Sequence, residues 1–138
     1  MTVLSREESN YKLPANIHAT LKKVNYNDTA ALVAALKGQD AVVSAITSAA
    51  TENQIHIVDA SIKAGVKRFV PAEYGVDTTR TDVLQRAPFL KGKEKTREYL
   101  IQKNKESGIE WTETITGPFF DWLVLERRIT CIWAPEKC

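Results

Sequence analysis

Cysteine is nearly absent from this chain of 138 residues. Its only two cysteines, Cys131 and Cys138, lie in the C-terminal tail, and the two histidines, His18 and His56, lie far from them in sequence. A disulfide framework needs several cysteines, and a structural zinc site needs cysteine and histidine ligands at close spacing. We therefore expect neither a disulfide-stapled fold nor a metal site.

Long apolar runs and a strong excess of charge are also lacking. Apolar stretches such as 41–46 are far shorter than the roughly 20 residues that cross a bilayer, and the N-terminus lacks the basic-then-apolar pattern of a signal peptide. The formal net charge is only +2, and basic residues are interspersed with acidic ones, which argues against a nucleic-acid interface. We expect a cytoplasmic protein that binds neither membranes nor nucleic acid.

The composition is that of a soluble globular domain. Hydrophobic residues make up 43% of the chain and charged residues 26%, a balance that supports a packed core. The length suits one domain, but it is too short for a cofactor domain followed by a separate substrate domain.

Strand-like and helix-like segments alternate along the chain. The run at 41–46 is almost continuously apolar, which is typical of a strand buried on both faces of a parallel sheet. Asp28 is a good N-cap for a helix that closes at Gly38, and Thr51 with Gln54 fits a capping box for a helix that ends at Gly65. We expect strands at 2–5, 20–24, 41–46, 66–70 and 109–116, helices at 29–37, 54–64, 89–105 and 119–125, and loops at 7–14 and 76–87.

This order predicts an α/β fold with a doubly wound parallel sheet in three layers, because strand, helix, strand repeats favour right-handed crossovers. Ligands in such folds bind beyond the carboxyl ends of the strands. The loops after Ser5, Ile46, Val70 and Thr116 are therefore expected to share one edge of the sheet.

Three segments resemble a known family. Residues 37–44 (KGQDAVVS), 64–75 (AGVKRFVPAEYG) and 108–122, which contain GIEWT and GPFFDW, are similar to the NmrA-like family, which includes the isoflavone-reductase-like atypical short-chain reductases. The resemblance covers about 1–125 and keeps the family's order. It implies a partial, Rossmann-like NAD(P)-binding domain over 1–126 and a divergent tail at 127–138.

Members of this family bind NADP(H), and the reductases among them transfer hydride to small, often aromatic substrates. By resemblance Arg6 follows the second family strand and meets the 2′-phosphate of NADPH, where a guanidinium can fork onto the phosphate. A solvated arginine beside Glu7 and Glu8 is the alternative interpretation.

Lys93 matches the family's catalytic lysine, on the helix before the last expected strand. A lysine placed there can bind the cofactor ribose, or donate a proton or electrostatic help to an oxygen that gains charge. The alternative is a solvated charged face, because Lys91 and Lys95 flank it.

Two further segments are implied to border the ligand. Glu73, Tyr74 and Gly75 correspond to a loop beside the nicotinamide, although the family's usual serine there is Ala72 in this chain. The segment Gly117, Pro118 and Phe119 corresponds to the substrate side. Ordinary loop structure for the first segment and core packing for the aromatic residue of the second are the alternatives.

The glycine-rich turn that holds the pyrophosphate in such folds has no counterpart in the sequence. The chain starts at what resembles the second family strand, so we expect a truncated, alternatively spliced or misannotated product with exposed sheet edges and weak or absent NADP(H) binding. The favoured function is an NADPH-dependent oxidoreductase acting on a small, possibly aromatic substrate. The alternatives are a non-catalytic dinucleotide-sensing module and a protein-interaction module that self-associates through a sheet edge.

Overall fold

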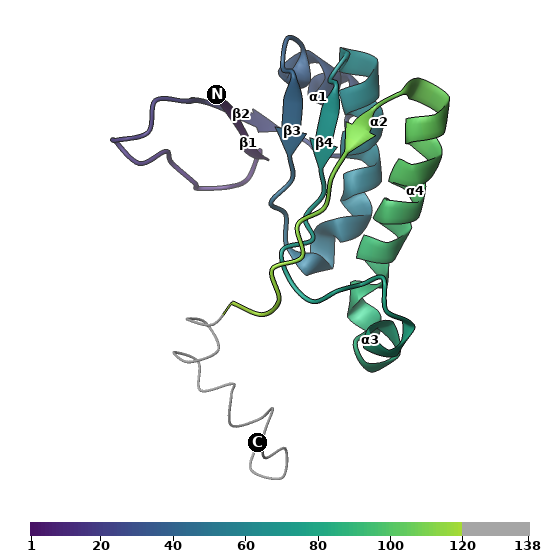
Figure 1. The fold of residues 1–138 in the computed structure, drawn as a ribbon. Coiled ribbons are helices and arrows are strands. Elements are labelled where there is room, and N and C mark those ends of the chain that lie inside the picture. Colours follow the sequence, from purple (N-terminus) through teal and green to yellow (C-terminus); the bar gives the residue numbers. More distant parts are fainter. Residues whose placement is uncertain (120–138) are drawn as a thin grey trace.

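A computed structural model describes residues 1–119 of the chain (Figure 1). The elements follow one another as strands and helices, with two short 3₁₀ segments. In chain order they are β1 (Thr2–Arg6), β2 (Thr20–Val24), α1 (Thr29–Leu36), β3 (Ala41–Val43), the 3₁₀ helix η1 (Ser48–Asn53), α2 (Gln54–Ala64), β4 (Arg68–Val70), α3 (Thr81–Arg86), the 3₁₀ helix η2 (Pro88–Leu90), α4 (Lys91–Ser107) and β5 (Glu110–Trp111).

The strands form two parallel sheets. One holds β1 and β2, and the other has the order β3-β4-β5. In the larger sheet Val42 pairs with Phe69, and Phe69 pairs with Trp111, so these three side chains share one face. The parallel pairing and the helical crossovers confirm the predicted doubly wound α/β class, in an incomplete form.

The helices that pack on the larger sheet cover one of its faces (Figure 1). Phe69 is fully buried there in a core that includes Val58 of α2 and Leu100 of α4. On the opposite face the side chain of Val43 is 65% exposed. Residues 1–119 thus supply two of the three expected layers. The prediction that the strand at 41–46 is buried on both faces is wrong, because no described helix packs on that second face.

The local signals for helix ends are confirmed. Asp28 Oδ1 accepts a hydrogen bond from the Ala31 backbone N–H, 3.0 Å away, at the start of α1. Gly65 and Gly108 close α2 and α4 with φ of 79° and 72°, a left-handed conformation that costs glycine nothing in steric strain. The helix boundaries follow from chemistry that is local in sequence.

The capping box predicted at Thr51 and Gln54 is wrong. Thr51 lies inside η1, and the N-cap position of α2, Asn53, makes no side-chain capping bond. The Gln54 side chain is fully buried, and its Oε1 accepts the backbone N–H of Ala72, 2.8 Å away. A tertiary contact has taken the side chain that the local motif needed.

Three other expectations changed or lie outside the described residues. The strand expected at 109–116 is only β5, because Pro71 ends its partner β4 and the Thr112 N–H to Phe69 O bond (3.2 Å) is the last between them. The stretch 76–87, expected as a loop, contains α3. The helix expected at 119–125 and the tail at 127–138 fall largely or wholly beyond residue 119.

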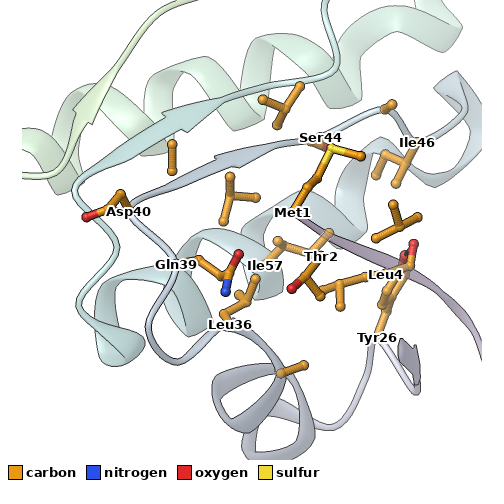
Figure 2. A pocket seen from close by; sticks show the side chains of 16 residues that line it. Met1, Thr2, Leu4, Tyr26, Leu36, Gln39, Asp40, Ser44, Ile46 and Ile57 are labelled. Carbon is orange, nitrogen blue, oxygen red and sulfur yellow. Dashed lines mark hydrogen bonds between the residues drawn. The ribbon is translucent and has the colours of Figure 1, made fainter. Parts of the chain in front are cut away.

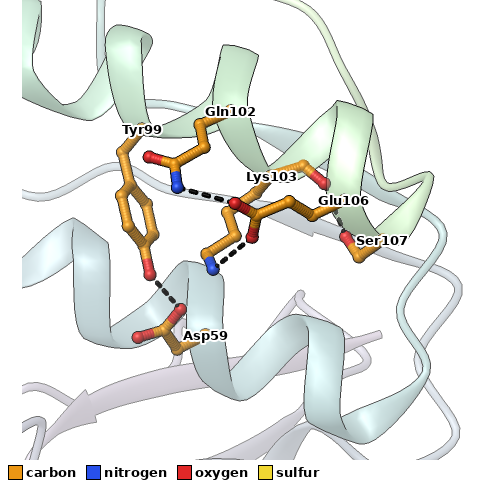
Figure 3. Close-up of polar contacts among 6 residues, drawn as sticks. All are labelled: Asp59, Tyr99, Gln102, Lys103, Glu106 and Ser107. Carbon is orange, nitrogen blue, oxygen red and sulfur yellow. Dashed lines mark hydrogen bonds and ion pairs between the residues drawn. The ribbon is translucent and has the colours of Figure 1, made fainter.

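Polar contacts join α2 to α4 and brace the last turns of α4 (Figure 3). The Tyr99 hydroxyl donates to Asp59 Oδ1 of α2, and Lys103 Nζ lies 5.2 Å from the centre of the Tyr99 ring. Lys103 Nζ is also 2.7 Å from Glu106 Oε2, one helical turn away. The Tyr99–Asp59 hydrogen bond holds α4 against α2, whereas both Lys103 contacts lie within α4. None of the helices within residues 1–119 combines the length and the apolar character needed to cross a membrane.

The N-cap of α1 gives a test of the fold. Replacing Asp28 with alanine removes the acceptor for the Ala31 N–H, and we expect the free energy of unfolding to fall by about 1 kcal/mol. Asp28→Asn is the matched control, because asparagine caps equally well and should stay within a few tenths of a kcal/mol of the parent. Urea unfolding followed by circular dichroism measures both, and equal midpoints for the alanine and asparagine variants would show that the cap contributes nothing.

Candidate functional site

The segment after β4 lies at the carboxyl-terminal edge of the larger sheet. Strands β3, β4 and β5 run in one direction, so the segments that follow them meet at that edge (Figure 1). Pro71, Ala72 and Glu73 directly after β4 are all buried. Backbone that leaves a strand and stays buried must find hydrogen-bond partners in the protein, and two helices provide them.

Lys93 of α4 is one of these partners. Lys93 is only 7% exposed, and its Nζ donates to the backbone carbonyl oxygen of Glu73. Lys91 and Lys95, its neighbours on the helix, are exposed. The solvated-face interpretation therefore does not apply to Lys93, whose ammonium group points into the protein.

Glu73 is 2% exposed and places its carboxylate in a small polar cluster. The Thr78 hydroxyl donates to Glu73 Oε2 over 3.0 Å, while Oε1 is buried without a hydrogen-bond partner. Arg97, one turn after Lys93 on α4, holds Thr78 through Nη1 to the hydroxyl (3.2 Å) and Nη2 to the carbonyl oxygen (3.3 Å). The carboxylate is thus fixed in place with one acceptor still free.

Burial changes the acid–base properties of both groups. Desolvation raises the pKa of Glu73, opposed by the Thr78 hydrogen bond and the charges of Lys93 and Arg97, while the charge of Glu113 adds to the rise. Desolvation lowers the pKa of Lys93, opposed by the negative charge of Glu73. Each group is shifted toward its neutral form, as is common where side chains exchange protons with a ligand.

Two glycine-containing loops meet beside this pair. The Gly117 N–H donates to the Gly75 carbonyl oxygen over 3.0 Å, and Gly117 has a φ of 67°. A Cβ atom at Gly75 would lie 3.3 Å from the Glu73 carbonyl oxygen and 3.8 Å from Lys93 Nζ. A side chain at Gly75 would therefore press on the Glu73 carbonyl oxygen, which accepts the Lys93 hydrogen bond, and would lie in ordinary van der Waals contact with the ammonium group.

The other residues implied by the resemblance lie at the rim of this cluster or away from it. Tyr74 is half-buried, and burial raises its pKa. Pro118 is exposed, and Phe119 is 52% exposed, so the core-packing alternative does not apply to Phe119 within the described part of the chain. Arg6 is the last residue of β1, with a side chain that is 69% exposed and 3.6 Å from Glu8. No described contact joins Arg6 to Lys93 or Glu73.

The structure thus brings Lys93, the 73–75 loop and Gly117 together and leaves Arg6 separate. Thr78 and the role of Arg97 as its holder were missed by the sequence analysis. Arg97 could have been found, because residues four apart share one face of a helix. Nothing in the local sequence marks Thr78, which lies in a segment expected to be an ordinary loop.

The residues present fit one end of a nicotinamide dinucleotide better than the other. A buried cationic donor, an unpartnered buried carboxylate oxygen and a loop without a side chain at Gly75 suit a polar ring carboxamide or ribose. The six glycines are scattered along the sequence, so no glycine-rich turn is available for a pyrophosphate. Within residues 1–119 no group of three or more histidine, cysteine, aspartate or glutamate side chains is arranged to hold a metal ion.

Comparison with known proteins places this geometry in a family. Oxidoreductase aprR of Aspergillus flavus is 39% identical over 123 residues, which are 88% of this chain and 40% of that protein. Isoflavone reductase homolog IRL of Zea mays is 37% identical over 101 residues, 72% of this chain and 32% of that protein. The chain therefore spans at most two fifths of the length of these relatives.

Solved structures agree with this assignment. The structure described as AtPrR2 with NADP+ and (+)pinoresinol superposes with a TM-score of 0.64 at 29% identity, covering 76% of this chain and 35% of that one. The ternary complex of leucoanthocyanidin reductase from Vitis vinifera gives 0.58 at 31% identity, covering 69% and 32%. The model of the NmrA-like family matches residues 2–121, and the chain belongs to that family.

Proposed function

We propose that this chain forms the nicotinamide-facing part of an NADPH-dependent oxidoreductase that reduces a small, aromatic substrate. The observation that carries the proposal is the buried Lys93 ammonium group held against the Glu73 carbonyl oxygen, beside Gly75 and Gly117. Support comes from the relatives, which are named as oxidoreductases and isoflavone reductase homologues, and from the neighbour that contains NADP+ and pinoresinol.

The buried lysine suits a reaction in which an oxygen gains negative charge. NADPH, when bound, supplies the hydride. Lys93 carries three N–H donors, and the Glu73 carbonyl uses one of them, so the remaining donors can hold or protonate a substrate oxygen. A positive charge in a site that excludes water stabilises such an oxygen more strongly than it would in solution. The lowered pKa of Lys93 makes proton donation easier at neutral pH.

Arg6 is proposed to select NADPH over NADH. It ends β1 on the side where ligands of parallel sheets bind, and its guanidinium is exposed. Its ion pair with Glu8 is a surface contact, which contributes little to stability and can be exchanged for a phosphate.

The proposed NAD(P)-binding domain extends from residue 1 to about residue 126.

Loss of the lysine tests the catalytic assignment. We expect Lys93→Ala to lower the rate of NADPH oxidation by about 100-fold or more, the usual contribution of a positioned proton donor, with pinoresinol or an isoflavone as trial substrates. Lys91→Ala is the matched control, since Lys91 is exposed on the same helix, and it should leave the rate unchanged. A Lys93→Ala variant that retains its circular dichroism spectrum and its turnover would remove the assignment.

The charge state of Glu73 can be tested through stability. The pKa of Glu73 is raised above 4.5 in the folded state, so the ionised carboxylate disfavours folding. The contribution of Glu73 to the free energy of unfolding therefore falls as the pH rises from about 4 toward neutrality. Glu73→Gln keeps an acceptor for Thr78 and removes this charge. The stability of Glu73→Gln relative to the parent should therefore increase with pH, in urea titrations at pH 4, 5.5 and 7. A difference that stays flat or decreases would contradict the assigned shift.

The affinity for the dinucleotide gives a third test. For the 138-residue chain we expect NADPH to bind with a dissociation constant well above about 1 µM, because no glycine-rich turn contacts the pyrophosphate. Arg6→Ala should weaken NADPH binding by a further factor of about 10, through the lost contact with the 2′-phosphate, and leave NADH binding unchanged. Lys12→Ala, in the exposed loop after β1, is the control. Calorimetric titration of the parent and both variants with each cofactor measures these affinities, and sub-micromolar NADPH binding by the parent would be the contrary result.

A further inference from the structure

One turn of α4 holds the segment 73–78 at both of its ends. Lys93 Nζ donates to the Glu73 carbonyl oxygen, and Arg97, four residues later on the helix, donates to the hydroxyl and the carbonyl oxygen of Thr78. The Thr78 hydroxyl in turn donates to Glu73 Oε2 over 3.0 Å. These hydrogen bonds form a closed circuit that leaves α4 at Arg97 and returns to it at Lys93.

The direction of each hydrogen bond in this circuit is fixed by the chemistry of its groups. A guanidinium group has donors and no acceptor, so Thr78 Oγ1 accepts from Arg97. A hydroxyl group has a single proton, and the Thr78 proton is left for Glu73 Oε2. Arg97 therefore orients the Thr78 hydroxyl as a donor to the carboxylate.

A donor at Oε2 favours the ionised form of Glu73. A hydrogen bond to a charged acceptor is stronger than one to a neutral acceptor, so the same hydroxyl stabilises a carboxylate more than a carboxylic acid. Desolvation raises the pKa of Glu73, and both the Thr78 hydrogen bond and the charge of Arg97 oppose that rise. Thr78 is 1% exposed, so bulk water does not compete for the carboxylate oxygen.

The charge of Glu73 matters to Lys93. Desolvation lowers the pKa of the Lys93 ammonium group, and the negative charge of Glu73 opposes that fall. A buried ammonium group without a nearby negative charge loses its proton more easily. The protonation state of the lysine therefore depends on that of the carboxylate.

Two other carboxylates lie near the circuit. Glu113, in the segment after β5, adds negative charge that raises the pKa of Glu73, so the donor at Oε2 is needed to keep Glu73 ionised. The pKa of Asp77 is lowered, chiefly by hydrogen bonds from the hydroxyl and the N–H of Thr79. Asp77 and Glu73 thus titrate in separate pH ranges.

We propose that Thr78 and Arg97 are positioning residues for Lys93: Arg97 orients the Thr78 hydroxyl, the hydroxyl keeps Glu73 ionised, and the ionised Glu73 keeps Lys93 charged. This inference rests on the proposed function, in which the charged lysine meets a substrate oxygen that gains negative charge. No described hydrogen bond joins Thr78 or Arg97 to Lys93, so both residues act through Glu73.

The test is an NMR titration of the full chain, labelled with ¹³C in the glutamate carboxyl groups and the lysine side chains. The signals of Glu73 and Lys93 are identified by their loss in Glu73→Gln and Lys93→Arg. Thr78→Val removes the hydroxyl and keeps the branched shape of the side chain. We expect it to lower the proton dissociation constant of Glu73 by about tenfold, because one hydrogen bond to a charged acceptor is lost. Thr78→Ser keeps a hydroxyl and should retain the parent's value.

The direction of the change separates positioning from simple packing. If Thr78 only filled space, its replacement would admit water to Glu73, and the proton dissociation constant would rise toward that of a solvated carboxyl group. A constant that is unchanged or increased in Thr78→Val, or one that falls equally in Thr78→Ser, would overturn the proposal.

Glu73→Gln tests the second half of the circuit. Glutamine still accepts from Thr78 but carries no charge, so the proton dissociation constant of Lys93 should increase by about threefold or more. A Lys93 titration midpoint that stays in place or moves to higher pH would show that the carboxylate does not hold the charge of the lysine.

Arg97→Met decides the question if Thr78→Val does not fold. It removes the donors that orient Thr78, and the Glu73 proton dissociation constant should fall by about threefold to tenfold. Arg86→Met is the matched control, since Arg86 is an exposed arginine of α3, and it should match the parent. Equal constants for the two methionine variants would remove Arg97 from the circuit and overturn the proposal.

These titrations need neither cofactor nor substrate. A negative result would therefore leave the proposed reductase function standing, and turnover that survives in Lys93→Ala would remove the reductase assignment without changing the titrations.

Discussion

The site depends on how the chain is held as it leaves β4. Directly after Pro71 the backbone stays buried, and its polar groups are satisfied by two helices. Gln54 of α2 accepts the Ala72 N–H, and Lys93 of α4 donates to the Glu73 carbonyl oxygen. The same contacts that stabilise this turn therefore draw a cationic side chain into the protein. One lysine therefore has two roles. It pairs a buried backbone carbonyl group, and it places a buried hydrogen-bond donor at the carboxyl-terminal edge of the sheet.

The lysine cannot be separated from the residues that surround its loop. Glu73 is buried with it, and Thr78 and Arg97 hold the carboxylate, so that charge near Lys93 is balanced without being neutralised completely. Gly75 lies against the Glu73 carbonyl oxygen that Lys93 binds, and Gly117 donates its N–H to the Gly75 carbonyl oxygen. This arrangement makes the end of the sheet a polar cluster in which the pKa values of Glu73 and Lys93 depend on each other. Changes at any of these positions should be felt at the lysine.

The other end of the molecule is organised by an interrupted sheet. β1 and β3 face one another across a groove with an apolar floor formed by Leu36 and Ile57 (Figure 2), and within residues 1–119 no strand pairs with either of them on that side. Open edges are usually covered, bent or charged in proteins, and here the Tyr26 hydroxyl binds the Leu4 carbonyl oxygen.

Much of the fold could be predicted from local chemistry, because caps, glycines and apolar runs act within a few residues of one another. Asp28, Gly65 and Gly108 set helix ends where the sequence places them, and the strand and helix order determined the parallel α/β class. Only the tertiary structure decided which charged residues are buried. Lys91, Lys93 and Lys95 look alike in sequence, yet only Lys93 faces the turn after β4. The Gln54 side chain similarly accepts the distant Ala72 N–H and does not cap its own helix. A buried polar group must be hydrogen-bonded, and its partner can lie anywhere in the chain.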